Sequence, residues 1–315
     1  MDRAAIPHRL PPGTKRLYYG DNYSVASSMF STILFPVDLS GTTEQMFCAV
    51  RELVGAGAGE VVLFHVVEKR EAEADPGAVE YARGVLEDWS RTLEAAGTPA
   101  VRSEVAVGTP WMEIVDRASR DHVSVILMGS RPTAMLRRTF LGNETENVLH
   151  QSACPVLVLK LNLIEPVDGA VCTLAKERLL KRVLFATDFS ANSERCIPFV
   201  EQMARANPED LIVVHIQDLR TLGYASTPQM EEFNRRDTRR LTELKQRFIA
   251  HGYAKVTPIL KTGNAISELL AIIAATDPTL VVMGAKGRSN AAAIMLGGVS
   301  ETVVHAADSH VLVVR

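Results

Sequence analysis

The sequence of 315 residues has no apolar run long enough to cross a membrane. Its apolar stretches, such as Thr279–Met283 and Val311–Val314, are far shorter than the roughly 18 residues that a membrane-spanning helix needs. The first residues, Met1–Tyr19, carry charges and prolines and lack the apolar segment of a secretory signal. These absences predict a cytoplasmic protein without a membrane partner.

Cysteines are also few, and basic residues do not outnumber acidic ones. The four cysteines never form a C-x-x-C pair, so the sequence indicates neither a zinc site nor a redox motif. We expect Cys48, Cys154, Cys172 and Cys196 to be small apolar residues in a reducing cytosol. The 34 Lys and Arg are outnumbered by 37 Asp and Glu, which argues against a nucleic-acid partner.

The signatures of several enzyme classes are missing as well. The sequence has no H-E-x-x-H, no G-x-S-x-G and no G-K-[ST] after a glycine loop. Without that lysine and hydroxyl, Walker-type phosphoryl transfer lacks the groups that hold phosphate and magnesium. His65 and His215 are flanked by apolar residues, so we predict packed histidines and not catalytic bases. Efficient catalysis is therefore not expected.

The chain does contain an internal repeat with the length of one domain. Ser31–Ser40 reads STILFPVDLS and Lys181–Ser190 reads KRVLFATDFS, which align Asp38 with Asp188 at an offset of 188 − 38 = 150. Later glycines recur at an offset of 155, in the pairs Gly108 and Gly263, Gly129 and Gly284, and Gly142 and Gly297. A period of this length indicates a duplicated domain and not a solenoid.

Each copy alternates short apolar strands with helices. Strands are predicted at 32–37, 61–67, 100–107, 123–128 and 155–159, and again at 183–186, 211–216, 254–260, 280–283 and 311–314. Helices are predicted between them, the first beginning at Ser40 as its N-cap. This pattern predicts an α/β fold with two tandem doubly wound, Rossmann-like domains. Each would hold a five-stranded parallel sheet of order 3-2-1-4-5 with helices on both faces.

The expected organisation is an N-terminal arm at 1–29, a first domain at 30–160, a linker at 161–180 and a second domain at 181–315. The last strand of each copy, in CPVLVLK and SHVLVVR, would be an exposed sheet edge and an aggregation liability. We therefore predict that these strands pair antiparallel within the chain, as a pseudo-two-fold internal dimer. Further association into a homodimer stays open.

Candidate site residues follow strands one and four. In an open parallel sheet, ligands bind beyond the carboxyl ends of the strands where the strand order reverses. Asp38 and Asp188 follow strand one, and Gly129 and Gly284 follow strand four. These residues meet if strands one and four are neighbours.

The loop after strand four of copy two reads MGAKGRSNAAAIMLGGVSETV. Glycines let backbone N–H groups approach a phosphate, and the helix that starts near Ser300 presents unpaired N–H donors. The hydroxyl of Ser300 and the charge of Lys286 or Arg288 could add to an anion site. On spacing alone, an ordinary glycine-bearing loop with a serine cap is an equal alternative.

In combination, these motifs resemble the universal stress protein family. They comprise G-x2-G-x9-G followed by Ser or Thr after a strand ending in Met-Gly, an Asp that closes strand one, and the final Cys-Pro-Val-Leu-Val. The resemblance covers about Ser31–Lys160 and Lys181–Arg315. It implies a stress-response or signalling module that binds ATP or AMP, with Mg²⁺ accompanying the phosphates and slow ATP hydrolysis at most. It also implies pairing through the last strand, by which the single-domain members dimerise.

The resemblance implies two site sets of unequal quality. In copy two they are Asp188, Gly284, Gly287, Arg288, Gly297, Gly298 and Ser300, where Gly298 replaces a family Ser or Thr and loses about 1 kcal/mol of hydrogen bonding. In copy one they are Asp38, Gly129, Gly142, Asn143 and Thr145. There Pro132 replaces the middle glycine and removes an N–H, while Asn143 replaces the Ser or Thr. We expect the second domain to be the better site. The alternative is a ligand-independent interaction protein in which both loops have drifted.

Overall fold

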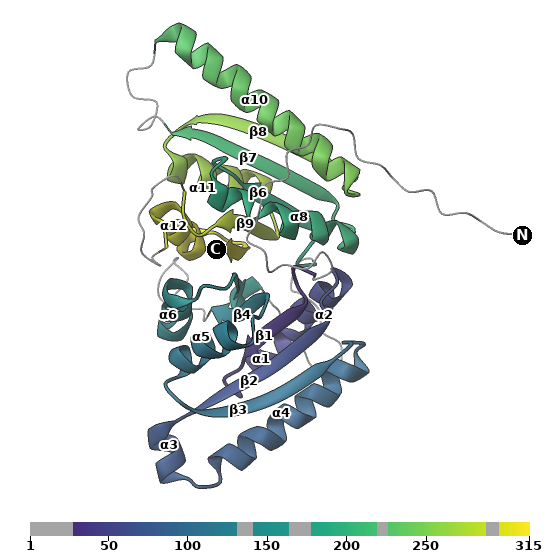
Figure 1. Cartoon of the computed structure of the whole chain (residues 1–315), viewed down its shortest axis with the longest axis vertical. Helices are drawn as coiled ribbons and strands as arrows, with labels where there is room; N and C mark the ends of the chain where they lie inside the picture. The colour runs from purple at the N-terminus through teal and green to yellow at the C-terminus, as the bar shows by residue number, and fades with distance from the viewer. Residues whose placement is uncertain (1–27, 131–140, 164–177, 219–225, 288–295) are drawn as a thin grey trace, which may run out of the picture.

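The fold is an α/β structure built on one continuous sheet, seen in a computed structural model that describes residues 28–130, 141–163, 178–218, 226–287 and 296–315 (Figure 1). The sheet has ten strands in the order β3-β2-β1-β4-β5-β10-β9-β6-β7-β8. The first half contains β1 (Thr32–Pro36), β2 (Glu60–Glu68), β3 (Val101–Gly108), β4 (Val125–Ser130) and β5 (Val156–Lys160). The second half contains β6 (Arg182–Ala186), β7 (Asp210–Asp218), β8 (Val256–Gly263), β9 (Leu280–Gly284) and β10 (His310–Val314).

Each half has the predicted strand order, 3-2-1-4-5, and all pairs within a half are parallel. All ten predicted strands are present, because continuous apolar runs are typical of strands buried on both faces. The two halves join where β10 pairs antiparallel with β5, with Leu312 opposite Leu157. The predicted pairing of the last strands is therefore present, and it covers both edges.

Helices cover both faces of the sheet. One face carries α2 (Phe47–Gly55), α4 (Ala78–Ala95), α8 (Ile197–Met203) and α10 (Thr227–Ala250). The other carries α5 (Pro110–Arg120), α6 (Asn143–Gln151), α11 (Ala265–Thr276) and α12 (Gly298–Ala306). Shorter helices are α1 (Thr42–Gln45), α3 (Lys69–Ala74), η1 (Leu161–Leu163), α7 (Ala191–Glu194) and η2 (Ala204–Ala206).

Successive strand residues bury against opposite helical layers, which is the period-two geometry of a strand. Ile33 and Phe35 belong to one core cluster, and Leu34 between them belongs to the other. Each cluster contains residues from both halves of the chain. The two repeats therefore share continuous apolar cores across the β5–β10 seam.

Two side chains reach across the seam to backbone carbonyls, in a pseudo-two-fold arrangement. Lys160 donates to the carbonyl of Val304 near the end of α12, and Arg315 donates to the carbonyl of Leu149 near the end of α6. The pairs are related by the repeat offset, since 315 − 160 = 155 and 304 − 149 = 155. Cations at helix C-termini are favourable because the last carbonyls carry partial negative charge. Each half therefore caps a helix of the other.

Some local expectations were wrong. The helix predicted from Ser40 is two helices, α1 and α2, and the N-cap residue of α1 is Gly41, while the Ser40 hydroxyl donates to Asp38. In the second half the equivalent Ser190 does cap α7. Cys154 and Cys196 are free, but Cys48 is disulfide-bonded, so the expectation for a reducing cytosol fails there.

Among the described helices, none combines the length and apolarity that a bilayer crossing requires.

Candidate functional site

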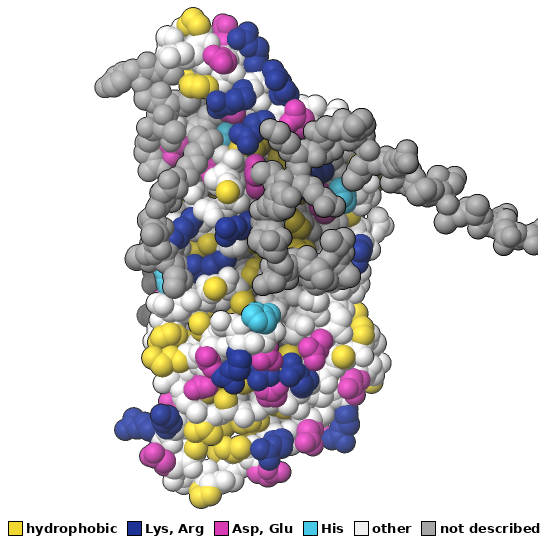
Figure 2. Space-filling view, viewed as in Figure 1, with side chains coloured by type: hydrophobic (Ala, Val, Ile, Leu, Met, Phe, Trp, Pro, Cys, Tyr) yellow, Lys and Arg dark blue, Asp and Glu magenta, His cyan; other side chains and the backbone are white. Residues whose placement is uncertain are grey.

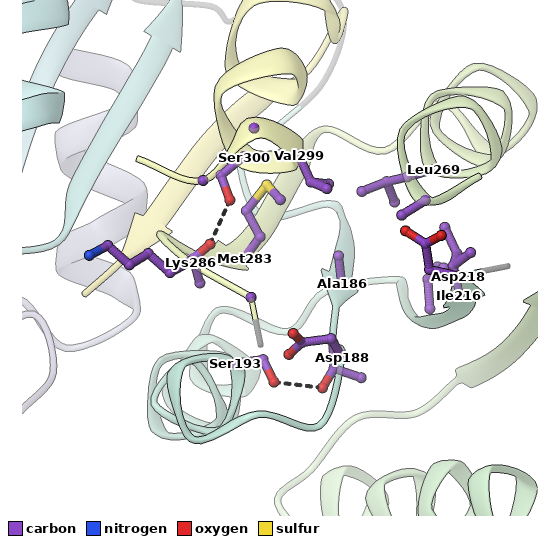
Figure 3. A pocket seen from close by; sticks show the side chains of 17 residues that line it. Ala186, Asp188, Ser193, Ile216, Asp218, Leu269, Met283, Lys286, Val299 and Ser300 are labelled. Atoms are coloured by element: carbon purple, nitrogen blue, oxygen red, sulfur yellow. Dashed lines mark hydrogen bonds between the residues drawn. The ribbon is translucent and has the colours of Figure 1, made fainter. Parts of the chain in front are cut away.

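A cavity of about 350 Å³ opens at the carboxyl ends of β6, β7 and β9 (Figure 3). The strand order reverses there, because β6 pairs with β7 on one side and with β9 on the other. Its lining combines apolar side chains of the strands and α11 with glycines and polar groups of the loops. These residues include Asp188, Val214, Ile216, Asp218, Leu269, Met283, Gly284, Gly287, Gly297, Gly298 and Ser300.

The structure places Asp188 beside the glycine loop. One carboxylate oxygen, Oδ1, accepts hydrogen bonds from the backbone N–H and the hydroxyl of Ser190, at 3.0 and 2.6 Å. The other, Oδ2, lies so close to Gly287 that a Cβ built on this glycine would be 2.9 Å from it. The carboxylate and the loop therefore form adjoining walls of one cavity, as the strand order predicts.

The glycines of the loop differ in what they permit. A Cβ on Gly284 would lie 3.1 Å from the backbone of Asn192, and one on Gly297 would lie 3.3 Å from the carbonyl oxygen of Ala285. These two glycines therefore allow backbone segments to approach each other. A Cβ on Gly298 would meet no atom of the described residues within 4 Å, so these residues leave room for a side chain there.

Ser300 lies in the first turn of α12, but its hydroxyl is already used. Its Oγ donates to the carbonyl of Gly284 at 2.8 Å, and the side chain is buried. Thr145 does the same in the first half, donating to Gly129 at 3.0 Å. We expected these hydroxyls to face a ligand, whereas they tie the helix to the end of the preceding strand. The first N–H groups of α12, which a helix leaves without intrahelical partners, still border the cavity at Gly298.

One predicted site residue, Arg288, lies outside the described residues, as does Pro132 of the first-half loop. Asp218 lines the cavity, although we did not single it out from the sequence. It ends β7 as Asp188 follows β6, so the same rule about strand ends could have found it.

The equivalent strand ends of the first half carry larger apolar side chains. A Cβ on Gly129 would lie 3.2 Å from the sulfur of Met46 and 3.4 Å from Leu161. Phe64 stands at the position equivalent to Val214, by the offset of 150, and is buried. At this strand end the first half therefore carries a larger apolar side chain, Phe64, where the second half has Val214.

A glutamate also links two helices across the first-half loop. Glu144, the second residue of α6, accepts a hydrogen bond from the backbone N–H of Trp111 in α5 at 2.9 Å. The equivalent residue in the second half is the apolar Val299, and α11 is capped instead by its own Asn264. Asp38 keeps the local geometry of Asp188, because its Oδ1 accepts from the N–H of Ser40. Gly142 is the N-cap residue of α6, which begins at Asn143.

Comparisons with known proteins agree with this architecture. A sequence model described as the universal stress protein family matches residues 29–160 and 180–315. The chain belongs to this family. A relative from Methanocaldococcus jannaschii, universal stress protein MJ0577, is 32% identical over 158 residues, covering 42% of this chain and 97% of its own length.

Other relatives extend the similarity along more of the chain. Universal stress protein Rv2005c from Mycobacterium tuberculosis is 25% identical over 222 residues, which is 69% of each chain. A solved universal stress protein from Archaeoglobus fulgidus superposes with a TM-score of 0.68 at 23% identity, covering 91% of this chain and 98% of that one. This universal stress protein therefore shares its fold with solved members of the family.

Proposed function

We propose that the second domain binds an adenine nucleotide, ATP or AMP, as a stress-response or signalling module. The supporting observation is the convergence of Asp188, the glycine loop and the N-terminus of α12 on one cavity. Backbone N–H groups and the positive end of the helix suit phosphates. The Asp188 carboxylate repels phosphate but accepts hydrogen bonds, so it suits the hydroxyls or amino group of an adenosine.

The size and chemistry of the cavity fit such a ligand. Its volume of about 350 Å³ is within the range of small-molecule sites. Val214, Ile216, Leu269 and Met283 offer an apolar wall to a base. Within the described ranges no group of three or more His, Cys, Asp or Glu is placed to hold a metal. We therefore expect Mg²⁺ to enter with the phosphates and to be held mainly by them and by water.

The first domain supports the alternative function, a scaffold without a ligand, for its own half. Phe64 stands where the second half has the smaller Val214, and Glu144 links α5 to α6. We propose that this domain, residues 30–160, serves as a partner for the second, residues 181–315. Because β5 and β10 cover each other, a homodimer of two chains would use another surface. We keep the cytoplasm as the proposed compartment, although the Cys48 disulfide is untypical of it, and we expect binding without efficient turnover.

Isothermal titration of the full chain with ATP, AMP and GTP tests this proposal. We expect one adenine nucleotide per chain. D188A should weaken binding about ten-fold or more, because hydrogen bonds to a charged group are lost. The matched first-domain variant D38A should leave affinity unchanged.

The titration can reject either part of the proposal. Absence of heat with ATP and AMP at millimolar-range concentrations would reject nucleotide binding. Two sites per chain, or equal losses in D38A and D188A, would reject the assignment to the second domain. Nucleotide released on denaturation of the purified protein, identified by mass, gives an independent check.

A further inference from the structure

A buried polar network lies behind the loop that carries Asp188. His215 of β7 donates from Nδ1 to the carbonyl of Thr187 at 2.8 Å, and its Nε2 lies 3.5 Å from the Asp237 carboxylate of α10. Gln217 donates to the same carboxylate at 2.9 Å and accepts from the hydroxyl of Thr262 at 3.0 Å. The His215, Gln217 and Asp237 side chains are almost fully buried.

Asp237 remains a carboxylate in this network. Burial opposes its ionisation, but hydrogen bonds from Gln217 and Arg236, with the charges of His215 and Arg236, outweigh burial and lower its pKa. Neither the carbonyl nor the ionised carboxylate beside His215 carries a proton. Both ring nitrogens of His215 therefore face acceptor oxygens, one of a carbonyl and one of a carboxylate.

The network continues through Phe189, the residue after Asp188. The ring of Phe189 lies 4.4 Å from that of His215, and the Arg240 guanidinium lies over the Phe189 ring at 4.1 Å. Arg240 also donates to the carbonyl of Phe189 at 3.3 Å and lies 3.7 Å from Glu194. Phe189 has a φ of +57°, a strained conformation for a residue with a bulky side chain. Groups from β7 and α10 thus hold both sides of a strained loop.

The first domain builds the same loop without these groups. Leu39 has a φ of +55°, and His65 contacts the carbonyl of Val37 at 2.8 Å, so the strain and the histidine contact are common to both halves. The polar partners are absent, and an apolar cluster takes their place. By the repeat offsets, the apolar residues Leu39, Val67, Ala82 and Val85 stand where Phe189, Gln217, Asp237 and Arg240 do.

This contrast indicates that the fold does not require the polar network. Burying a charged network costs desolvation, and apolar residues of similar packing are often as stable or more so. The first domain shows within the same chain that an apolar cluster supports this fold. The network occurs in the half with the open cavity, directly behind the loop of Asp188. We call His215, Asp237, Phe189 and Arg240 the loop clamp.

We propose that His215, Asp237 and Arg240 are positioning residues for the nucleotide site, holding the Asp188 loop in the conformation that accepts the ligand. This inference rests on the proposed function and extends it to α10. That helix lies outermost on the second half, where Lys and Arg side chains gather on the surface (Figures 1 and 2). A change in how α10 docks would thereby alter affinity without touching the ligand.

The first experiment needs no ligand. Hydrogen exchange by mass spectrometry on the full chain would follow peptides covering 187–190. In the wild type the N–H groups of Phe189 and Ser190 donate to Thr187 and Asp188. Release of the clamp should expose them, so R240Q and D237N should speed exchange there. R239Q, which removes an exposed arginine beside Arg240, should leave exchange unchanged.

The second experiment measures affinity for ATP in the same variants. R240Q should weaken binding about five-fold, because a cation–π contact and a hydrogen bond are lost. R240K keeps a cation over the ring and should recover part of this loss. In a D188N background R240Q should have little further effect, because the clamp acts through Asp188. Simple destabilisation would give additive losses and no recovery by lysine.

Each outcome decides a separate point. Exchange equal to wild type in R240Q and D237N would overturn the clamp. Faster exchange with unchanged ATP affinity, or additive losses in D188N, would overturn the positioning role. If the wild type binds no ATP, the proposed function is rejected and the positioning role with it. Faster exchange in R240Q and D237N would in that case still show that the loop clamp holds the Asp188 loop.

Discussion

Acidification should weaken the seam between the two halves through one buried histidine. His310, the first residue of β10, is almost fully buried, and its Nδ1 accepts a hydrogen bond from the backbone N–H of Lys160 at 3.0 Å. Burial, and then the nearby Lys160 ammonium, lower the pKa of His310 from 6.5 to about 4. A proton on Nδ1 would replace an acceptor by a donor facing another N–H.

The sign and size of the effect follow from the two pKa values. Below 6.5 the unfolded imidazole takes up a proton, while the folded one resists until about 4. Stability is therefore complete above 6.5 and is lost as the pH falls through this window. The full difference corresponds to roughly 3 kcal/mol, of which about 2 kcal/mol is lost by pH 5.

Urea unfolding of the wild type and H310N near pH 7.5, 6 and 5 measures this loss. Asparagine keeps an acceptor for the Lys160 N–H but does not titrate, so wild-type stability should fall by about 2 kcal/mol relative to H310N. H122N is the control, because it removes an exposed imidazole at a left-handed position that asparagine tolerates. Parallel pH profiles for the wild type and H310N would refute the reasoning.

Four further substitutions test the loop and the seam. G298S should tighten ATP binding about five-fold in titration, because the position is open and the hydroxyl adds a donor; unchanged affinity would contradict this. G287A should displace the Asp188 carboxylate and weaken ATP binding with little change in melting temperature. G284A should lower the melting temperature, because its Cβ meets backbone. A lower melting temperature in G287A with an unchanged one in G284A would refute these roles. Burial lowers the pKa of Lys160 to about 8, so K160M should raise the unfolding free energy by about 1–2 kcal/mol at neutral pH. That gain should shrink as the pH rises from about 8 to 10.5, because the buried charge is then lost in the wild type, and a constant gain would contradict it.

The sequence could predict the sheet because its signal is local and repeated. Apolar runs mark the strands, and the offset that aligns Asp38 with Asp188 gives two copies of one topology. The predicted pairing of β5 with β10 followed from the need to cover two apolar edges, and the structure contains it. The proximity of Asp188 to Gly287 then follows from β6 lying beside β9.

Side-chain directions could not be predicted in the same way. The spacing that places Ser300 at the start of a helix is the same whether its hydroxyl faces a ligand or donates to Gly284. The approach of the Met46 sulfur to Gly129 depends on where α1 lies, which no local pattern gives. His215 is buried, as predicted, but its partner Asp237 is 22 residues away on a helix, beyond any periodic signal.

The two halves are unequal in chemistry, yet the site depends on both. The N-terminus of α12 borders the cavity, while its C-terminal end receives the Lys160 ammonium from the first half. The strand before the cavity, β9, pairs with β10, and β10 pairs with β5 of the first half. Removing the first half would expose the apolar edge of β10. The first domain, which we propose to be a partner of the second, thus completes the sheet on which the second domain's cavity is built.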